Sequence, residues 1–141
     1  MRALKTDREV ATMVKLLAAS FCLLAVGSSG AHADADYDVC MKAASTNVDF
    51  GECGGAYMKR ADDALNVAWK KVYPLASGQT AKDLLAEEQA WIAYKDKSCL
   101  LYANAENGRE GQVISYPACR AGVIEARTRD LISIGKDLAS H

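Results

Sequence analysis

The chain has 141 residues, 50% of them hydrophobic and 25% charged, and its 17 Lys and Arg stand against 18 Asp and Glu for a formal net charge of −1 at pH 7. Interspersed charges of both signs argue against a nucleic-acid-binding protein, because such a protein presents a basic stripe. The length allows one modest hydrophobic core and no more.

Residues 1–33 have the parts of an export signal in the right order. Basic residues precede an apolar run, Leu16–Val26, and Ala31 and Ala33 supply the small side chains of a signal-peptidase site. A transmembrane helix needs roughly 20 apolar residues, and this run is shorter. We therefore expect a cleaved signal peptide over residues 1–33 and a single mature domain over residues 34–141, with an uncleaved anchor as the alternative.

The mature domain has helical periodicity nearly throughout, and alternating β-branched stretches are nearly absent. A short helix is expected over residues 39–44. A first long helix is predicted over residues 54–73, because Pro74 and Ser77-Gly78 end it.

A second long helix is predicted from Thr80 to Asn104, and the spacing of Thr80 and Asp83 resembles a capping box. A third is predicted from Tyr116 onward. The residues expected to line the core are Met58, Ala61, Leu65, Ala68, Val72 and Leu75 at alternating three- and four-residue steps, then Leu84, Leu85, Trp91, Ile92, Cys99 and Tyr102, then Ala121, Ile124, Thr128, Leu131 and Leu138 at heptad-like spacing. The sequence thus predicts an all-α fold, an antiparallel bundle of three long helices plus a short N-terminal helix.

Four cysteines remain after Cys22 leaves with the signal: Cys40, Cys53, Cys99 and Cys119. An even thiol count in a small exported domain indicates disulfides. Four cysteines allow three connectivities. We favour Cys40 with Cys53 and Cys99 with Cys119, because each pair closes one helical hairpin locally.

No histidine lies between residues 34 and 140, and no C-x-x-C occurs, so we expect no zinc site, no cofactor and no enzymatic activity. The helical segments carry carboxylates that could serve as acid and base: Asp62, Asp63, Glu87, Glu88, Asp96, Glu125 and Asp130. Adjacent pairs such as Glu87 and Glu88 diverge by about 100° on a helix. We therefore interpret these carboxylates as a solvated charged face.

The run Leu84–Cys99, which contains Gln89, Trp91, Tyr94 and Asp96, resembles the signature of the LprI-type lysozyme inhibitor domain of bacterial envelope proteins. The resemblance extends to Cys53, Tyr57, Leu65, Asn66, Cys119 and Thr128–Leu131, so it covers essentially the whole mature chain. It implies a helical envelope protein and, for some relatives, inhibition of lysozyme.

The four motif residues are expected to be structural. Trp91 and Tyr94 should pack against the bundle, as should the aromatic pair Trp69 and Tyr73. Asp96 should be a half-buried internal brace, which requires a partner such as Arg127 or Arg129. This chain departs from the family pattern at Lys95, where arginine is usual, and at Asn107–Gly111, where a Gly-Gly turn is usual.

An inhibitor needs a rigid projection that blocks the enzyme's cleft. The connection Ala103–Ser115, closed at its base by a Cys99–Cys119 bridge, has that character, and the residues expected to contact a partner are Asn104, Glu106, Arg109 and Glu110. The leading hypothesis is therefore a periplasmic or secreted protein whose partner is a lysozyme, as a monomer or a domain-swapped dimer. A non-inhibitory periplasmic accessory or host-directed interaction protein is the alternative, and a carboxylate-dependent glycan-processing enzyme is the third.

Overall fold

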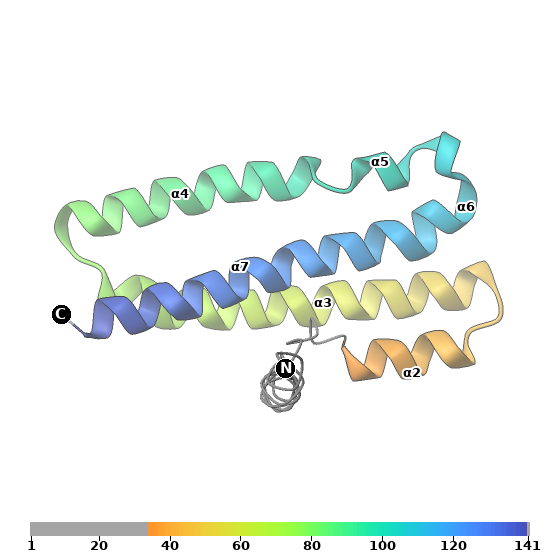
Figure 1. Ribbon diagram of the computed structural model, residues 1–141, viewed down its shortest axis with the longest axis horizontal. Helices are drawn as coiled ribbons and strands as arrows, with labels where there is room; N and C mark the ends of the chain where they lie inside the picture. Colours follow the sequence, from red (N-terminus) through yellow and green to blue (C-terminus); the bar gives the residue numbers. More distant parts are fainter. Residues whose placement is uncertain (1–33, 141) are drawn as a thin grey trace, which may run out of the picture. The chain divides into compact units, whose positions relative to one another are not determined.

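The computed structural model describes residues 34–140, and that part of the chain is helical and contains no strand (Figure 1). The predicted signal peptide and His141 lie outside the described residues. Among the described helices, none is long and apolar enough to cross a membrane. The four main helices are α2 (Ala35–Ala43), α3 (Asn47–Val72), α4 (Gly78–Lys97) and α7 (Tyr116–Ala139). The predicted all-α bundle is confirmed.

Helices α2 and α3 form a hairpin that is fixed at its turn and at its open end. Thr46 and Asp49 make a reciprocal capping box at the start of α3, with Asp49 N–H donating to Thr46 Oγ1 (3.2 Å). The disulfide Cys40–Cys53 joins the two helices, with 5.7 Å between the Cα atoms, as predicted. The capping box explains why α3 begins at Asn47, seven residues before the predicted start.

Asp34 holds the open end of the same hairpin. Its carboxylate accepts from Tyr37 N–H (2.8 Å), which caps α2, and from Arg60 Nε (2.7 Å) and Nη2 (2.8 Å) on α3. Hydrogen bonding to Arg60 is the main reason that the pKa of the Asp34 carboxyl lies below its usual value. Tyr37 also stacks on Tyr57, with 4.7 Å between ring centroids. The short first helix is thus tied to α3 by covalent, ionic and aromatic contacts.

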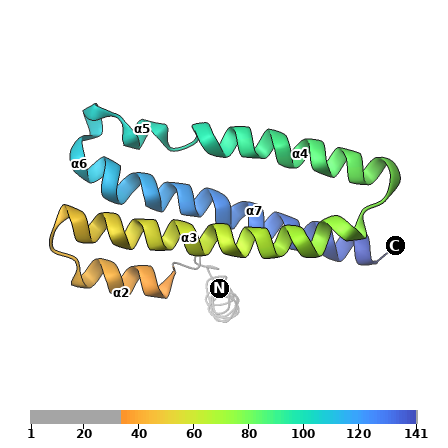
Figure 2. The same cartoon turned by 180° about the vertical axis from the view of Figure 1, so that it is seen from behind.

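The core lies between α3 and α7, which pack side by side over most of their length (Figures 1 and 2). The buried residues on the predicted stripes are Ala61, Leu65, Ala68 and Val72 of α3 and Ala121, Ile124 and Leu131 of α7. Tyr57 is also buried there, and burial, followed by the negative charge of Glu125, raises the pKa of its hydroxyl to about 12. Trp69 and Tyr73 pack against this core, as expected, and stack on each other with 4.8 Å between ring centroids. Leu75 was predicted to continue the stripe, but it follows the end of α3 and is 49% exposed.

Helix α4 lies along the edge of the bundle, with α7 between it and α2 (Figure 2). It begins at Gly78, and Thr80 lies within its first turn, so the predicted capping box at Thr80 and Asp83 is wrong. The side chain of Asp83 instead accepts from Gln79 Nε2 (2.9 Å). The predicted second stripe is wrong in part, because Leu85 and Ile92 are 39% and 43% exposed.

Candidate functional site

The segment between α4 and α7, residues 98–115, is a chain of short helical turns that we call the connecting loop (Figure 1). It contains α5 (Leu100–Ala103), a 3-10 turn (Ala105–Asn107), α6 (Gly108–Glu110) and a π-helical turn (Gly111–Ser115). It lies at the same end of the bundle as the turn between α2 and α3.

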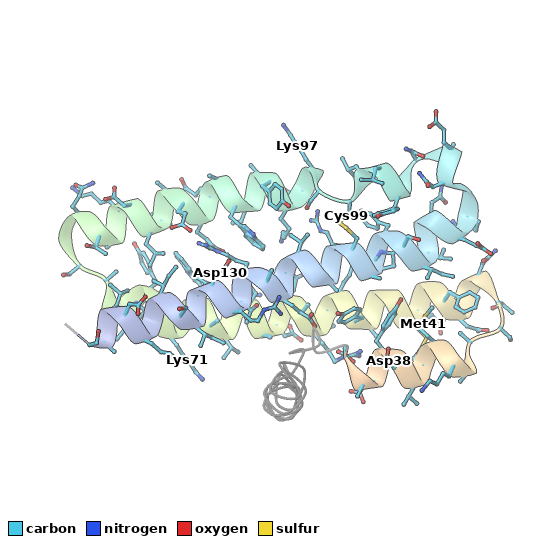
Figure 3. The ribbon with its side chains drawn as sticks, viewed as in Figure 1. Asp38, Met41, Lys71, Lys97, Cys99 and Asp130 are labelled. Carbon is cyan, nitrogen blue, oxygen red and sulfur yellow. A yellow bond between two sulfur atoms is a disulfide. The ribbon has the colours of Figure 1, made fainter. Side chains whose placement is uncertain are left out.

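The connecting loop begins where Cys99 takes a left-handed conformation, with φ of 69°. A residue other than glycine costs roughly 1 to 2 kcal/mol in this conformation, and Cys99 is held there by its disulfide to Cys119 on α7 (Cα–Cα 5.9 Å). The predicted helix from Thr80 to Asn104 therefore ends at Lys97. Figure 3 shows Lys97 pointing away from the bundle and Cys99 pointing toward α7.

Two asparagines brace the middle of the connecting loop. Asn104 Oδ1 accepts from the backbone N–H groups of Glu106 (3.0 Å) and Asn107 (3.2 Å). Asn107 Nδ2 donates to Asn104 Oδ1 and to the carbonyl of Leu101. These bonds satisfy backbone groups that a short turn would otherwise leave to water, so the loop has a defined shape.

Two glycines make the tight path possible. Gly108 has φ of +63°, a conformation that other residues rarely adopt. A Cβ on Gly111 would lie 2.6 Å from the carbonyl oxygen of Tyr102 and 2.6 Å from Asn107 Cβ. The π-helical turn then anchors the loop, because Val113 is buried and lies against α3.

The predicted contact residues Asn104, Glu106, Arg109 and Glu110 all lie in this loop and are exposed. Their side chains differ in whether they already form hydrogen bonds within the loop. Asn104 is engaged within the loop, and Arg109 Nη1 donates to Gln112 Oε1 (3.2 Å). Glu106 and Glu110 lie in the first turns of short helical segments and extend into solvent. The loop therefore presents two carboxylates and one guanidinium on a braced backbone.

A second polar feature, an ionic seam, joins α4 to α7. Arg127 is 4% exposed, and its Nε donates to Glu88 Oε2 (2.9 Å) while its Nη1 donates to Glu87 Oε1 (2.6 Å). Nη2 also lies 2.9 Å from Glu88 Oε2 but is not aligned for a hydrogen bond. Burial alone would lower the pKa of Arg127, but the bonds to the two carboxylates raise it above its usual value.

The interpretation of these carboxylates as a solvated charged face is therefore wrong for Glu88, whereas the side chain of Glu87 is 56% exposed. Their side chains do diverge, but a guanidinium offers several nitrogens in a planar fork and can reach both. Glu88 is only 7% exposed. The sequence signal that could have revealed this pair is the spacing of Glu88, which lies four residues after the core residue Leu84 and three residues before Trp91, on the same side of the helix.

The expected internal brace at Asp96 is also wrong in its partner and its burial. Asp96 Oδ1 pairs with Arg120 Nη2 (2.8 Å), and the Asp96 side chain is 62% exposed. Because α4 and α7 are antiparallel, the last turn of α4 faces the first turns of α7, where Arg120 lies, and Arg127 is two turns further along. Arg120 also donates to the carbonyl of Lys95.

The aromatic residues of the motif have different environments. Trp91 packs against the core, as expected, and lies close to two cations, with 5.6 Å from its ring centroid to Lys95 Nζ and 6.0 Å to Arg127 Cζ. Tyr94 was expected to pack, but it is 58% exposed on the flank of α4. Gln89 is exposed as well. Lys95 points inward and reaches Asp62 on α3 (3.7 Å).

These features define a disulfide-linked helical domain whose most distinctive surface is an exposed connecting loop braced by asparagine hydrogen bonds. The chain belongs to the LprI family of lysozyme inhibitors, because the family model described as "Lysozyme inhibitor LprI" matches residues 40–131. The match runs from the first cysteine of the α2–α3 bridge to buried Leu131 and includes the whole connecting loop. Searches of curated proteins and of solved structures find no match to this chain.

Proposed function

We propose that this protein is an exported inhibitor of lysozyme-type peptidoglycan hydrolases and that it acts by inserting the connecting loop into the enzyme's cleft. The family match suggests lysozyme as the partner. The two disulfides and the family fit an extracytoplasmic location. Export itself rests on the signal peptide predicted for residues 1–33.

The observation that carries the proposal is the braced, exposed loop from residue 104 to residue 110, closed at its base by the Cys99–Cys119 bridge. A projection that is already ordered loses little conformational entropy on binding. An inhibitor of this kind needs no catalytic group of its own, since occupation of the cleft is sufficient.

The net charge of residues 34–141 also supports a lysozyme as the partner. Residues 34–141 contain 13 Lys and Arg against 16 Asp and Glu, a formal charge of −3, whereas common lysozymes are basic. Long-range attraction between opposite net charges increases the association rate. Glycan hydrolases of this type hold a pair of carboxylates in the cleft, and Arg109 offers them a guanidinium, while Glu106 and Glu110 favour approach to a basic rim.

The test is a lysis assay in which purified oxidised protein is incubated with a panel of lysozymes and bacterial cell walls. We expect inhibition at near-stoichiometric ratios, with weaker inhibition at high salt. Absence of inhibition at stoichiometric excess across the panel would contradict the proposal and favour a non-inhibitory interaction protein. Release of glycan fragments without added lysozyme would favour an enzyme.

The site is tested separately by charge reversal. Arg109→Glu should weaken inhibition at least about tenfold, because it places a carboxylate against the cleft carboxylates. Lys71→Glu is the matched control, since Lys71 is an exposed cation on α3, near the end opposite the connecting loop (Figure 3). Equal inhibition by both variants would show that the loop is not the contact surface.

A further inference from the structure

Helix α4 faces the bundle with charged as well as apolar side chains, because Leu84 (5% exposed) and Trp91 pack against the core beside two charged residues. The side facing the bundle carries the charged residues Glu88 and Lys95, whose side chains are 9% and 18% exposed. The side facing solvent carries Leu85 and Ile92 at 39% and 43% exposure. Surface helices usually direct their apolar residues inward, so two large apolar side chains left exposed beside the buried stripe need an explanation.

The outward stripe, which we call the α4 face, carries no charged residue over about two and a half turns. It consists of Leu85, Ala86, Gln89, Ile92 and Ala93, which recur at helical spacing and are all exposed. Figures 1 and 2 show α4 at the outer edge of the described chain, with no other element on the side away from α7. Oppositely charged residues end the stripe. Lys82 lies toward the start of α4, and toward its end lies Asp96, whose side chain is 62% exposed although its Oδ1 also pairs with Arg120 of the same chain.

We propose that the α4 face is a self-association surface, on which two copies of this chain pair their α4 helices antiparallel about a two-fold axis at Gln89. In that register Lys82 of one copy lies opposite Asp96 of the other, and this contact occurs twice. Such a surface is isologous, which is the commonest arrangement in homodimers. The ionic seam between α4 and α7 of each copy stays intact in this dimer, so the two copies do not exchange helices.

The register is also complementary in size. Leu85 of one copy lies opposite Ala93 of the other, and Ile92 lies opposite Ala86, so each large side chain meets a small one. Alternation of large and small residues across facing positions allows two helices to approach closely. Gln89 meets its own copy at the axis, where a side-chain amide can both donate to and accept from its mate.

The affinity should be modest. Helix α4 has 20 residues and is therefore about 30 Å long, and one pair of helices of that length buries less surface than a standard stable interface. The dimer should accordingly dissociate on dilution. This inference does not depend on lysozyme binding, and the antiparallel pairing directs the two connecting loops to opposite ends of the assembly.

Sedimentation equilibrium of the purified oxidised protein tests the proposal. We expect a concentration-dependent dimer, whose dissociation constant Ile92→Glu should raise on the order of a hundredfold by burying an unpaired charge. Val67→Glu is the matched control, because Val67 is 52% exposed on α3, and it should not change the dimer. A wild-type protein that stays monomeric at all accessible concentrations would overturn the inference.

The register is tested by charge exchange. Lys82→Asp and Asp96→Lys should each weaken the homodimer, since like charges then face one another at two contacts. Asp96→Lys also removes the ion pair with Arg120 of the same chain, so thermal unfolding checks that this variant remains folded. An equimolar mixture of the two variants should form heterodimers more tightly than either forms homodimers, because both contacts are again between opposite charges. A mixture no tighter than the separate variants would overturn this register.

A covalent probe distinguishes the pairing from a helix exchange. Gln89→Cys should form an intermolecular disulfide with its own copy under mild oxidation, and Gln79→Cys, which lies outside the stripe, should not. Intact mass reports the covalent dimer. Equal crosslinking of both variants, or loss of the Cys99–Cys119 bridge in the dimer, would contradict pairing through the α4 face.

Discussion

Arg127 on α7 and Glu88 on α4 form a buried ion pair, with 2.9 Å between Nε and Oε2 and with 4% and 7% of the residues exposed. Glu87 adds a second carboxylate to the same guanidinium. Helix α4 therefore contacts α7 through charge as well as through the apolar side chains of Leu84 and Trp91. Buried ion pairs often add little net stability, and we expect this one to specify which face of α4 points inward.

Neutralising Glu88 should be far more damaging than neutralising its neighbour. Glu88→Gln leaves Arg127 buried without its main counter-charge and should lower the free energy of unfolding by about 3 kcal/mol. Glu87→Gln removes a carboxylate whose side chain is 56% exposed, and the expected loss is about 0.5 kcal/mol. Urea denaturation measures both, and equal losses would contradict the burial difference.

The adjacent glycines Gly54 and Gly55 should respond in opposite ways to the same substitution. A Cβ on Gly54 would lie 2.5 Å from Cγ of Pro117, which is buried at the start of α7, so Gly54→Ala should destabilise by about 2 kcal/mol. Gly55 has open space around that position, and Gly55→Ala should stabilise α3 by up to about 1 kcal/mol. Thermal unfolding measures both, and a stabilising Gly54→Ala would show that α7 can shift away.

Local chemistry explains which parts of the fold could be predicted from the sequence. The α3 and α7 stripes were predicted because apolar spacing alone determines their buried faces. The bridge Cys40–Cys53 was predicted because the two cysteines flank one turn. The start of α3 was missed, although Thr46 and Asp49 have the spacing of a capping box.

Tertiary contacts explain the parts that could not be predicted. The end of α4 depends on Cys99, which takes a conformation that its residue type does not favour and that only the bridge to α7 imposes. The face of α4 that points toward α7 depends on the ion pair with Arg127, which lies 39 residues from Glu88 in the sequence. The loop residues Glu106 and Arg109 could be located from sequence, but the bracing by Asn104 and Asn107 could not.

The ion pair of Asp34 with Arg60 should make stability depend on pH in the acid range. Hydrogen bonds from Arg60, and secondarily from Tyr37 N–H, hold the pKa of Asp34 below its usual 3.8, so the folded state takes up this proton less readily than the unfolded state. The stabilisation is therefore complete above the unfolded pKa and is lost as pH falls through the lower folded pKa. The loss should begin below about pH 5.

The comparison of wild type with Asp34→Asn isolates this contribution. Because the pair is only partly buried, with 38% of the Arg60 side chain exposed, the wild type should be more stable by only about 1 kcal/mol at pH 7. The difference should shrink toward pH 3. The pKa of Asp49 is also lowered, chiefly by Ser45 N–H, so Asp49→Asn serves as a background in which the Asp34 effect should persist. A constant difference at all pH values would contradict the assignment.

Removal of the Cys99–Cys119 bridge should disorder the connecting loop as well as lower stability. The double variant Cys99→Ala with Cys119→Ala should lose about 3 kcal/mol of unfolding free energy through loop-closure entropy, since the bridge spans 20 residues. It should also increase amide hydrogen exchange over residues 104–110, because Cys99 no longer holds the left-handed turn that starts the loop.

The other bridge provides the matched control. Cys40→Ala with Cys53→Ala opens a loop of 13 residues and should cost nearly the same free energy, yet it should leave exchange over residues 104–110 unchanged. Lysozyme inhibition should then be lost only in the first double variant when both are assayed at a temperature where they remain folded. If the first variant keeps both slow exchange and inhibition, the asparagine bonds alone order the loop.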